Sequence, residues 1–199
     1  MMTTLRPEAK VGLIVGLAFA MVATKASAQS QTPAKQCVGA SSLVFRDTVS
    51  FFLDAPTGWT LDCAAGKGDG VLTVLYRVGE TWRTGPAVLY ANVLTPKGAT
   101  VLSFRERVQA EVTEWIAGVP DAKVTVRKSI PTKDGKTAVV RQFSSGSRSL
   151  FEIVAYVPRG RVIPILAMTA HSNRAFADAL PAFERLVRSY APGPTVQVR

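Results

Sequence analysis

The chain has 199 residues, of which 47% are hydrophobic, and it carries a formal net charge of +10. This length suits one domain with a core large enough to fold without stabilising cross-links. It excludes the class of small domains that depend on several disulfides or a metal. The excess of Lys and Arg favours encounters with acidic partners but assigns no ligand, because the cations are scattered along the chain.

Residues 1–28 have the three parts of a secretory signal peptide. A basic start is followed by the apolar stretch 11–23 and by small residues at Ala26 and Ala28 that form a cleavage site. The apolar stretch is shorter than the roughly 20 residues that a membrane-spanning helix needs. The sequence therefore predicts cleavage after Ala28, a mature N-terminus at Gln29, and a periplasmic or secreted protein without a stable membrane anchor.

The mature chain divides into a short arm, one domain and a tail. Residues 29–36 are polar and contain little to bury, so we expect a flexible arm. The single domain is expected over 37–191, and the proline-containing segment 192–199 is expected to be a C-terminal tail.

Both cysteines, Cys37 and Cys63, remain in the mature chain. An even number of cysteines in an oxidising compartment favours one disulfide bond. Closing this loop would stabilise the fold by about 3–4 kcal/mol in the chain-entropy model. A redox role would need a closer pair such as C-x-x-C, so the predicted role is structural.

The first half of the domain is predicted to contain strands. Two short apolar runs, 50–53 and 60–62, flank a proline- and glycine-containing turn at 54–58. Two longer runs, 71–78 and 87–94, are rich in β-branched and aromatic residues and predict two further strands. The segment between 60–62 and 71–78 is expected to be a flexible connection.

A helix is predicted to begin after Ser103. Ser103 and Glu106 have the spacing of a capping box, and Gly118 is placed to end the helix. Apolar residues recur between these ends at helical spacing: Phe104, Val108, Val112, Trp115, Ile116 and Val119.

The next part of the chain is predicted to form an antiparallel meander. Four strands, at 124–130, 137–143, 150–157 and 161–170, follow one another through short connections. The segment 162–168 is apolar on both sides, which predicts a central strand in a sheet covered on both faces.

A second helical region is predicted to begin at the capping residue Ser172 and to continue to Tyr190. Pro181 lies inside it. Because a proline in a helix interior loses one hydrogen bond and clashes with the preceding turn, we expect a break there and a new helix starting near Pro181.

The order of these elements resembles the PsbP-like superfamily, which includes bacterial envelope proteins of the DcrB type. The resemblance covers about residues 44–191 and depends on four groups of residues: Phe51 to Trp59, Tyr90 to Val93, Ala155 to Val157, and Phe176 with Pro181 to Tyr190. It implies an α+β fold in which an antiparallel β-sheet is sandwiched between helices. It also implies a non-catalytic binding or assembly role, and it transfers no site residue.

Catalytic patterns are weak. His171 and Ser172 are the one pairing of a base with a nucleophile, but adjacent residues rarely face one another and a third orienting group is needed. The single histidine leaves a zinc site with too few ligands. The glycine-rich stretch 66–70 lacks the spacing of a phosphate-binding loop. We therefore expect no catalytic residues, no metal and no cofactor.

One loop is a candidate interaction site. It contains Glu80, Trp82 and Arg83 between glycines, and a tryptophan in such a loop can be a stacking platform for a ligand or partner. The alternative is that Trp82 folds back over the edge of the sheet.

The function indicated by the sequence is that of an exported, non-catalytic binding or assembly-accessory protein. Its partner would be an envelope protein or a small ligand, and nucleic acid is not expected outside the cytoplasm. Two alternatives stay open. One is a small-ligand carrier with a pocket between sheet and helix. The other is a periplasmic hydrolase that uses His171 and Ser172.

Overall fold

The structure is a computed structural model that describes residues 41–46, 49–95, 102–119 and 121–194. The signal peptide, its cleavage residues Ala26, Ala28 and Gln29, the arm and Cys37 lie outside these residues. Cleavage, export and the pairing of Cys37 with Cys63 therefore remain predictions.

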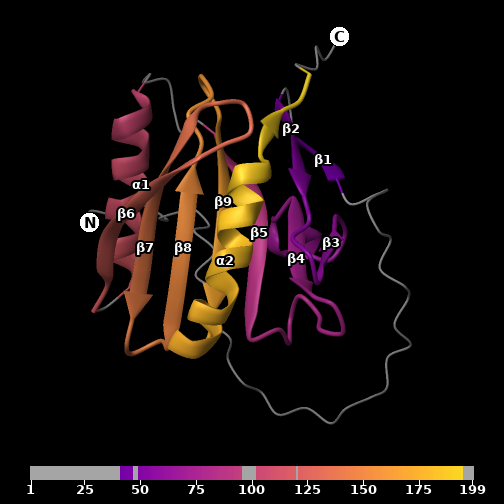
Figure 1. The fold of residues 1–199 in the computed structure, drawn as a ribbon. Coiled ribbons are helices and arrows are strands. Elements are labelled where there is room, and N and C mark those ends of the chain that lie inside the picture. Colours follow the sequence, from indigo (N-terminus) through magenta and orange to yellow (C-terminus); the bar gives the residue numbers. More distant parts are fainter. Residues whose placement is uncertain (1–40, 47–48, 96–101, 120, 195–199) are drawn as a thin grey trace, which may run out of the picture.

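The larger of two sheets is an antiparallel sheet of seven strands with the order β3-β4-β5-β9-β8-β7-β6 (Figure 1). Its strands are β3 (Trp59–Asp62), β4 (Thr73–Arg77), β5 (Ala87–Leu94), β6 (Lys123–Pro131), β7 (Thr137–Ser145), β8 (Leu150–Tyr156) and β9 (Ile163–Ala170). The predicted meander is confirmed, because β6, β7, β8 and β9 pair in sequence order. The doubly apolar strand β9 is central, as its pattern predicted.

A second, three-stranded antiparallel sheet has the order β1-β2-β10. It consists of β1 (Ser41–Arg46), β2 (Val49–Asp54) and β10 (Ala191–Pro192). The turn predicted at 54–58 is present, with Gly58 at a φ of 80°, but it joins two sheets and does not close a hairpin. The reason is that β2 already has antiparallel partners in β1 and β10.

The beginning of the expected C-terminal tail is part of this sheet. Pro192 belongs to β10, and the Gly193 N–H donates to the Ser50 carbonyl at 2.9 Å. The guanidinium of Arg159 donates to the carbonyl oxygens of both Ser50 and Gly193. These contacts hold 191–194 against the domain, although their proline-rich composition suggests a loose end.

Helix α1 (Phe104–Gly118) has the predicted bounds. The Ser103 hydroxyl accepts the Glu106 N–H, and the Glu106 carboxylate accepts the Ser103 N–H at 2.7 Å, which is the predicted capping box. Helix α2 (Asn173–Ser189) begins after its cap Ser172.

The break predicted at Pro181 is wrong, because α2 is one continuous helix. Pro181 is exposed, and so is Ala177, whose carbonyl would otherwise accept the missing N–H. Water can satisfy that carbonyl on the solvent side. The apolar face of the helix, with Phe176 before the proline and Phe183 after it, stays buried throughout.

The two helices belong to different hydrophobic clusters. Phe183 and Leu186 of α2 pack in one cluster with Leu89 of β5 and Leu166 of β9. Val108, Val112 and Trp115 of α1 pack in another cluster, which includes Tyr90 of β5 and Tyr156 of β8. Since neighbouring residues of β5 alternate between the clusters, these lie on opposite faces of the sheet. The fold is therefore of the predicted α+β class.

Candidate functional site

The candidate site lies at the end of the sheet where α2 begins, the lower end in Figure 1. There β4 ends at Arg77, a loop of residues 78–86 leads into β5, and β9 leads into α2. The His171 N–H donates to the Pro86 carbonyl at 3.1 Å and so connects the two chain segments. Thus the structure brings the predicted interaction loop and the His171–Ser172 pair to the same end of the molecule.

The 78–86 loop is compact. Gly79 has a φ of 88°, a backbone conformation that residues with side chains rarely adopt, and the Glu80 N–H donates to the Arg77 carbonyl at 2.9 Å. The Gly85 N–H donates to the Thr81 carbonyl at 3.0 Å. Successive turns therefore fix the loop without a helix or strand.

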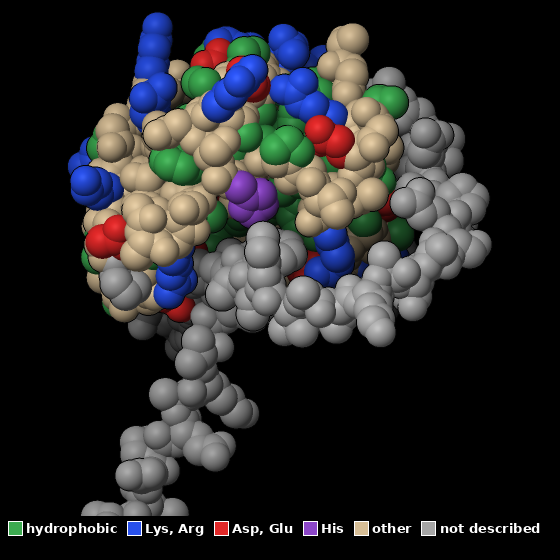
Figure 2. All heavy atoms as spheres, turned by 90° about the horizontal axis from the view of Figure 1, so that it is seen from below, with side chains coloured by type: hydrophobic (Ala, Val, Ile, Leu, Met, Phe, Trp, Pro, Cys, Tyr) green, Lys and Arg blue, Asp and Glu red, His purple; other side chains and the backbone are tan. Residues whose placement is uncertain are grey.

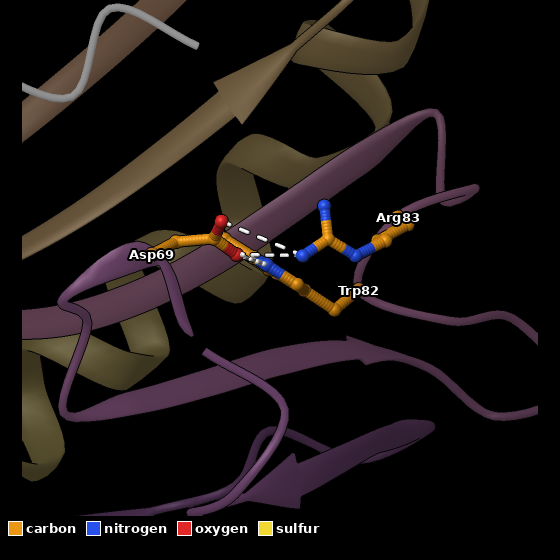
Figure 3. A network of polar contacts seen from close by, with 3 residues as sticks. All are labelled: Asp69, Trp82 and Arg83. Carbon is orange, nitrogen blue, oxygen red and sulfur yellow. Dashed lines mark hydrogen bonds and ion pairs between the residues drawn. The ribbon is translucent and has the colours of Figure 1, made fainter. Parts of the chain in front are cut away.

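Trp82 fastens this loop to the sheet. Its side chain is buried, with 8% of its area exposed, and its indole N–H donates to Asp69 Oδ2 at 2.9 Å (Figure 3). The ring also packs edge-on against Tyr90, with a centroid separation of 6.1 Å. The hypothesis that Trp82 is an exposed stacking platform is therefore wrong, and the alternative, in which it folds back over the sheet, describes its position.

Asp69 organises the neighbouring connection. It lies in a 3-10 turn (Lys67–Asp69), where a flexible connection was expected, and it accepts hydrogen bonds from both Trp82 and Arg83. Arg83 Nη2 lies 3.3 Å from Asp69 Oδ2, and the Arg83 side chain stays 60% exposed. Of the three residues predicted for the interaction loop, Arg83 is the one on the surface here.

A pocket of about 340 Å³ lies between this loop and the start of α2. Four of its lining residues are charged, with two of each sign: Arg77, Arg174, Glu80 and Asp178. The other four are small or apolar: Pro86, Ala87, Ser172 and Ala175. Figure 2 shows this end of the molecule, where the single histidine, His171, is exposed among basic, acidic and apolar side chains.

The Arg77 guanidinium is fixed at the pocket. It lies over the ring of Trp59, with 5.7 Å between the guanidinium carbon and the ring centroid, and it donates to the Asp178 carbonyl at 3.1 Å. Arg174 forms a weaker contact, with 3.9 Å between its Nε and Asp178 Oδ2, and its side chain is almost fully exposed. One cation of the pocket is therefore held in place, and the other is free to reorient.

Glu80 provides the unusual feature of this pocket. Its Oε2 atom is buried and has no hydrogen-bond partner, alone among the buried side-chain polar atoms of the described residues. It lies so close to Gly85 that a Cβ added there would be 3.1 Å away. Because buried polar atoms are nearly always paired, an unpaired carboxylate oxygen beside a pocket requires an explanation.

The hydroxyl of Ser172 has a structural role. Its Oγ accepts the Ala175 N–H at 3.1 Å and caps the first turn of α2. His171 precedes this cap, directly after the end of β9, and is exposed. The geometry thus gives the serine hydroxyl the function of a helix cap.

The α1 face of the sheet contains a buried carboxyl group that the sequence analysis missed. Glu152 of β8 is 7% exposed, and Tyr90 donates its hydroxyl to Glu152 Oε1 at 2.8 Å. Burial raises the pKa of the Glu152 carboxyl to about 7, and the hydrogen bond from Tyr90 opposes that shift. The sequence feature that could have revealed this buried carboxyl is the single acidic residue within the apolar segment 150–157.

A second buried acid on this sheet also pairs with a tyrosine. Tyr76 donates its hydroxyl to Asp62 Oδ2 at 2.9 Å, and burial is the main cause that raises the pKa of Tyr76 to about 12. Asp62 Oδ1 in turn accepts the backbone N–H groups of Ala64 and Ala65. The two acids therefore serve the packing of the sheet and the following turn.

The described ranges contain no group of three or more His, Cys, Asp or Glu side chains arranged to hold a metal ion. No helix among them combines the length and apolarity required to span a membrane. Cys63 is half-buried beside Thr73, whose hydroxyl lies 3.7 Å from its sulfur.

Comparisons with known proteins concern the fold. No protein-family profile matches the chain, and no curated protein matches it. The chain is similar to the solved structure of a cyanobacterial PsbP (CyanoP) from Synechocystis sp. PCC 6803, with a TM-score of 0.48 and 12% identity over 84% of this chain and 98% of that chain. It is also similar to a Pseudomonas aeruginosa protein of unknown function, with a TM-score of 0.45 and 16% identity over 79% and 100%.

The first of these structures is a PsbP, the family that the order of elements in the sequence resembles. Both identities are below 25% and both TM-scores are below 0.5. No function or site residue is therefore carried over from either structure.

Proposed function

We propose that this protein is an exported, non-catalytic binding protein that binds its ligand between the 78–86 loop and the start of α2. The observation that carries the proposal is the charged pocket of about 340 Å³ at this position. Its volume lies at the lower end of the range for small-molecule sites. Trp82 holds the 78–86 loop in place and the Arg77 guanidinium is fixed in the lining, so the pocket is formed before a ligand arrives.

The proposal includes the three-layer arrangement of the PsbP-like fold, an α/β/α sandwich. Its support is that the buried residues of α1 and α2 belong to clusters on opposite faces of the seven-stranded sheet. In this arrangement the ends of the sheet stay open to solvent, and the pocket lies at one such end.

Export is the second part of the proposal. A protein recovered from the periplasm or medium should have the mass of a chain that starts at Gln29, and it should have no thiol that reacts before reduction. Recovery of a chain that retains Met1, with reactive Cys37 and Cys63, would contradict export.

Native mass spectrometry tests the binding function. Protein purified gently from the compartment to which it is exported should carry a small non-covalent adduct. This adduct should be reduced or absent in an Arg77→Met variant, which loses a cation of the pocket. Arg185→Met is the matched control, because Arg185 is exposed on α2 about 16 Å along the helix from Arg174. The mass of the bare chain alone in all three proteins would contradict the proposal.

The exposed side chain of Arg83 favours a second candidate, an assembly-accessory protein that binds an envelope partner through this loop. A photo-crosslinking residue at position 83 should then capture one defined partner in cells, and the same residue at position 185 should not. Equal capture at both positions would contradict this candidate.

The third candidate function is that of a hydrolase that uses His171 and Ser172. It requires the Ser172 hydroxyl to act as a nucleophile, although this hydroxyl caps α2. An envelope phenotype that depends on His171 and is lost in His171→Ala, while the protein stays folded, would support the hydrolase over the binding function.

A further inference from the structure

We propose that the pocket between the 78–86 loop and α2 binds a small zwitterion, a molecule that carries an ammonium group and a carboxylate group, such as a free amino acid. This inference rests on the proposed binding function and adds the chemical class of the ligand. It follows from three features of the pocket: an unpaired carboxylate, a fixed guanidinium, and small apolar residues in the same lining.

The carboxylate of Glu80 is the partner for the ammonium group. While it is ionised, an acidic side chain accepts hydrogen bonds and donates none, and Glu80 Oε2 has no donor in the described structure. Because this oxygen is buried from solvent, the Glu80 side chain has to turn toward the pocket that it lines in order to meet a ligand. An ammonium group has three N–H donors and a positive charge, so it can supply this carboxylate with both a hydrogen-bond donor and a compensating charge. A purely anionic ligand would instead be repelled by it.

The guanidinium of Arg77 is the partner for the carboxylate group. Arg77 uses one donor on the Asp178 carbonyl and lies against Trp59, so its orientation is fixed while further N–H groups remain. A planar guanidinium suits a carboxylate because it can form two parallel hydrogen bonds. Arg174 is exposed beside Asp178 and can turn toward the same anionic group.

The rest of the lining suits a short aliphatic body. Pro86 and Ala87 come from the start of β5, and Ala175 comes from the first turn of α2. The balance of charges also matters, because the pocket has two cationic and two acidic residues. A ligand without net charge matches this balance better than a simple anion or a simple cation.

The test uses three probes that share one branched aliphatic chain, each titrated by calorimetry into the mature protein. L-Leucine carries both charges, 4-methylpentanoate lacks the ammonium group, and isopentylamine lacks the carboxylate. We expect L-leucine to bind at least about tenfold more tightly than either analogue, because each analogue leaves one charged partner unpaired. Leucine binding that is absent, or no tighter than that of the analogues, would overturn the inference.

Variants locate the two charges. Glu80→Gln and Arg77→Met should each weaken leucine binding at least about tenfold, while Arg185→Met should bind like the unchanged protein. Thermal unfolding of each variant shows whether the fold is intact, and Glu80→Gln is the milder change because it keeps the shape of the side chain. Unchanged leucine affinity in a folded Glu80→Gln protein would overturn the inference.

Failure of this inference and failure of the proposed function give different results. If the protein carries a native adduct in the pocket but does not bind leucine, the zwitterion class is wrong and the binding function stands. If no adduct is found and none of the three probes binds, both are wrong.

Discussion

The two faces of the seven-stranded sheet are built from different kinds of side chain. The cluster beneath α2 is apolar, with Phe183 and Leu186 of the helix fully buried against the sheet. The cluster beneath α1 is rich in aromatic residues that pair with acids, including Tyr90 with Glu152. One face therefore depends on volume and close packing, while the other also depends on hydrogen bonds and charge.

The 78–86 loop connects these two environments. Trp82 fastens it to the α1 face, next to Tyr90, and Glu80 lines the pocket beside Ala87 and Ala175, which pack on the α2 face. The anchor of the loop and its candidate binding group can therefore be changed separately.

The largest effect is expected from a cavity on the α2 face. Phe183→Ala removes a fully buried ring, so it should lower the free energy of unfolding by about 3–5 kcal/mol. Urea denaturation measures this loss. Phe52→Ala is the matched control, since the Phe52 side chain is 40% exposed and its loss should be clearly smaller. Equal losses for the two variants would contradict the difference in packing.

The second effect concerns charge on the α1 face. Burial raises the pKa of Glu152 to about 7, from 4.5 in an unfolded chain, so the folded protein binds the extra proton between these values. Stability from this group is therefore full below pH 4.5 and falls as the pH rises toward 7. Since one pKa unit corresponds to about 1.4 kcal/mol, the whole loss is about 3 kcal/mol.

Glu152→Gln removes this titration but keeps an acceptor for the Tyr90 hydroxyl. The variant should be more stable than the unchanged protein by up to about 3 kcal/mol at pH 8, and the difference should vanish near pH 4. Urea denaturation of both proteins from pH 4 to pH 8 measures it. A stability difference that does not change with pH would contradict the raised pKa.

The third effect separates the anchor of the loop from its surface. Asp69→Ala leaves the buried Trp82 N–H without an acceptor, which should lower the free energy of unfolding by about 1–3 kcal/mol. Arg83→Met removes the exposed partner of the same carboxylate and should lower it by less than about 1 kcal/mol. Thermal unfolding compares the two, and a larger loss for Arg83→Met would contradict the anchoring role of Trp82.

The smallest effect is expected at the start of α1. Ser103→Ala removes one half of the capping box and should lower the free energy of unfolding by about 1 kcal/mol. Helix-specific hydrogen exchange should show faster opening in the first turn of α1 and unchanged protection in α2. Equal acceleration in both helices would show that the cap acts on the whole fold and not on α1 alone.

Local patterns predicted the elements of this fold well. The capping box predicted the start of α1 and Gly118 its end, and the doubly apolar segment predicted the central position of β9. Pro181 was misjudged because propensity describes an isolated helix, and here the buried face of α2 outweighs one missing hydrogen bond on its solvent side. Strand β1 was missed although its pairing with β2 is local, with Arg46 opposite Val49.

The candidate site was predicted only in part. The sequence predicted the loop with Glu80, Trp82 and Arg83 as a candidate interaction site. It did not predict the anchor of this loop, because Asp69 is 13 residues before Trp82. The pocket joins Arg77 to a helix that begins nearly 100 residues later, and no local pattern encodes that approach. Long-range packing therefore decides which residues of the loop face a ligand.

Chemical-shift mapping by NMR tests the central claim most directly. L-Leucine, or the adduct recovered with the protein, is added to ¹⁵N-labelled mature protein, and the perturbed backbone amides are located on the structure. We predict that the shifts concentrate at 79–87 and at 172–178, the two segments that line the pocket. Saturable shifts centred on α1 or on β6, with 79–87 and 172–178 unchanged, would contradict a binding site at this end of the sheet.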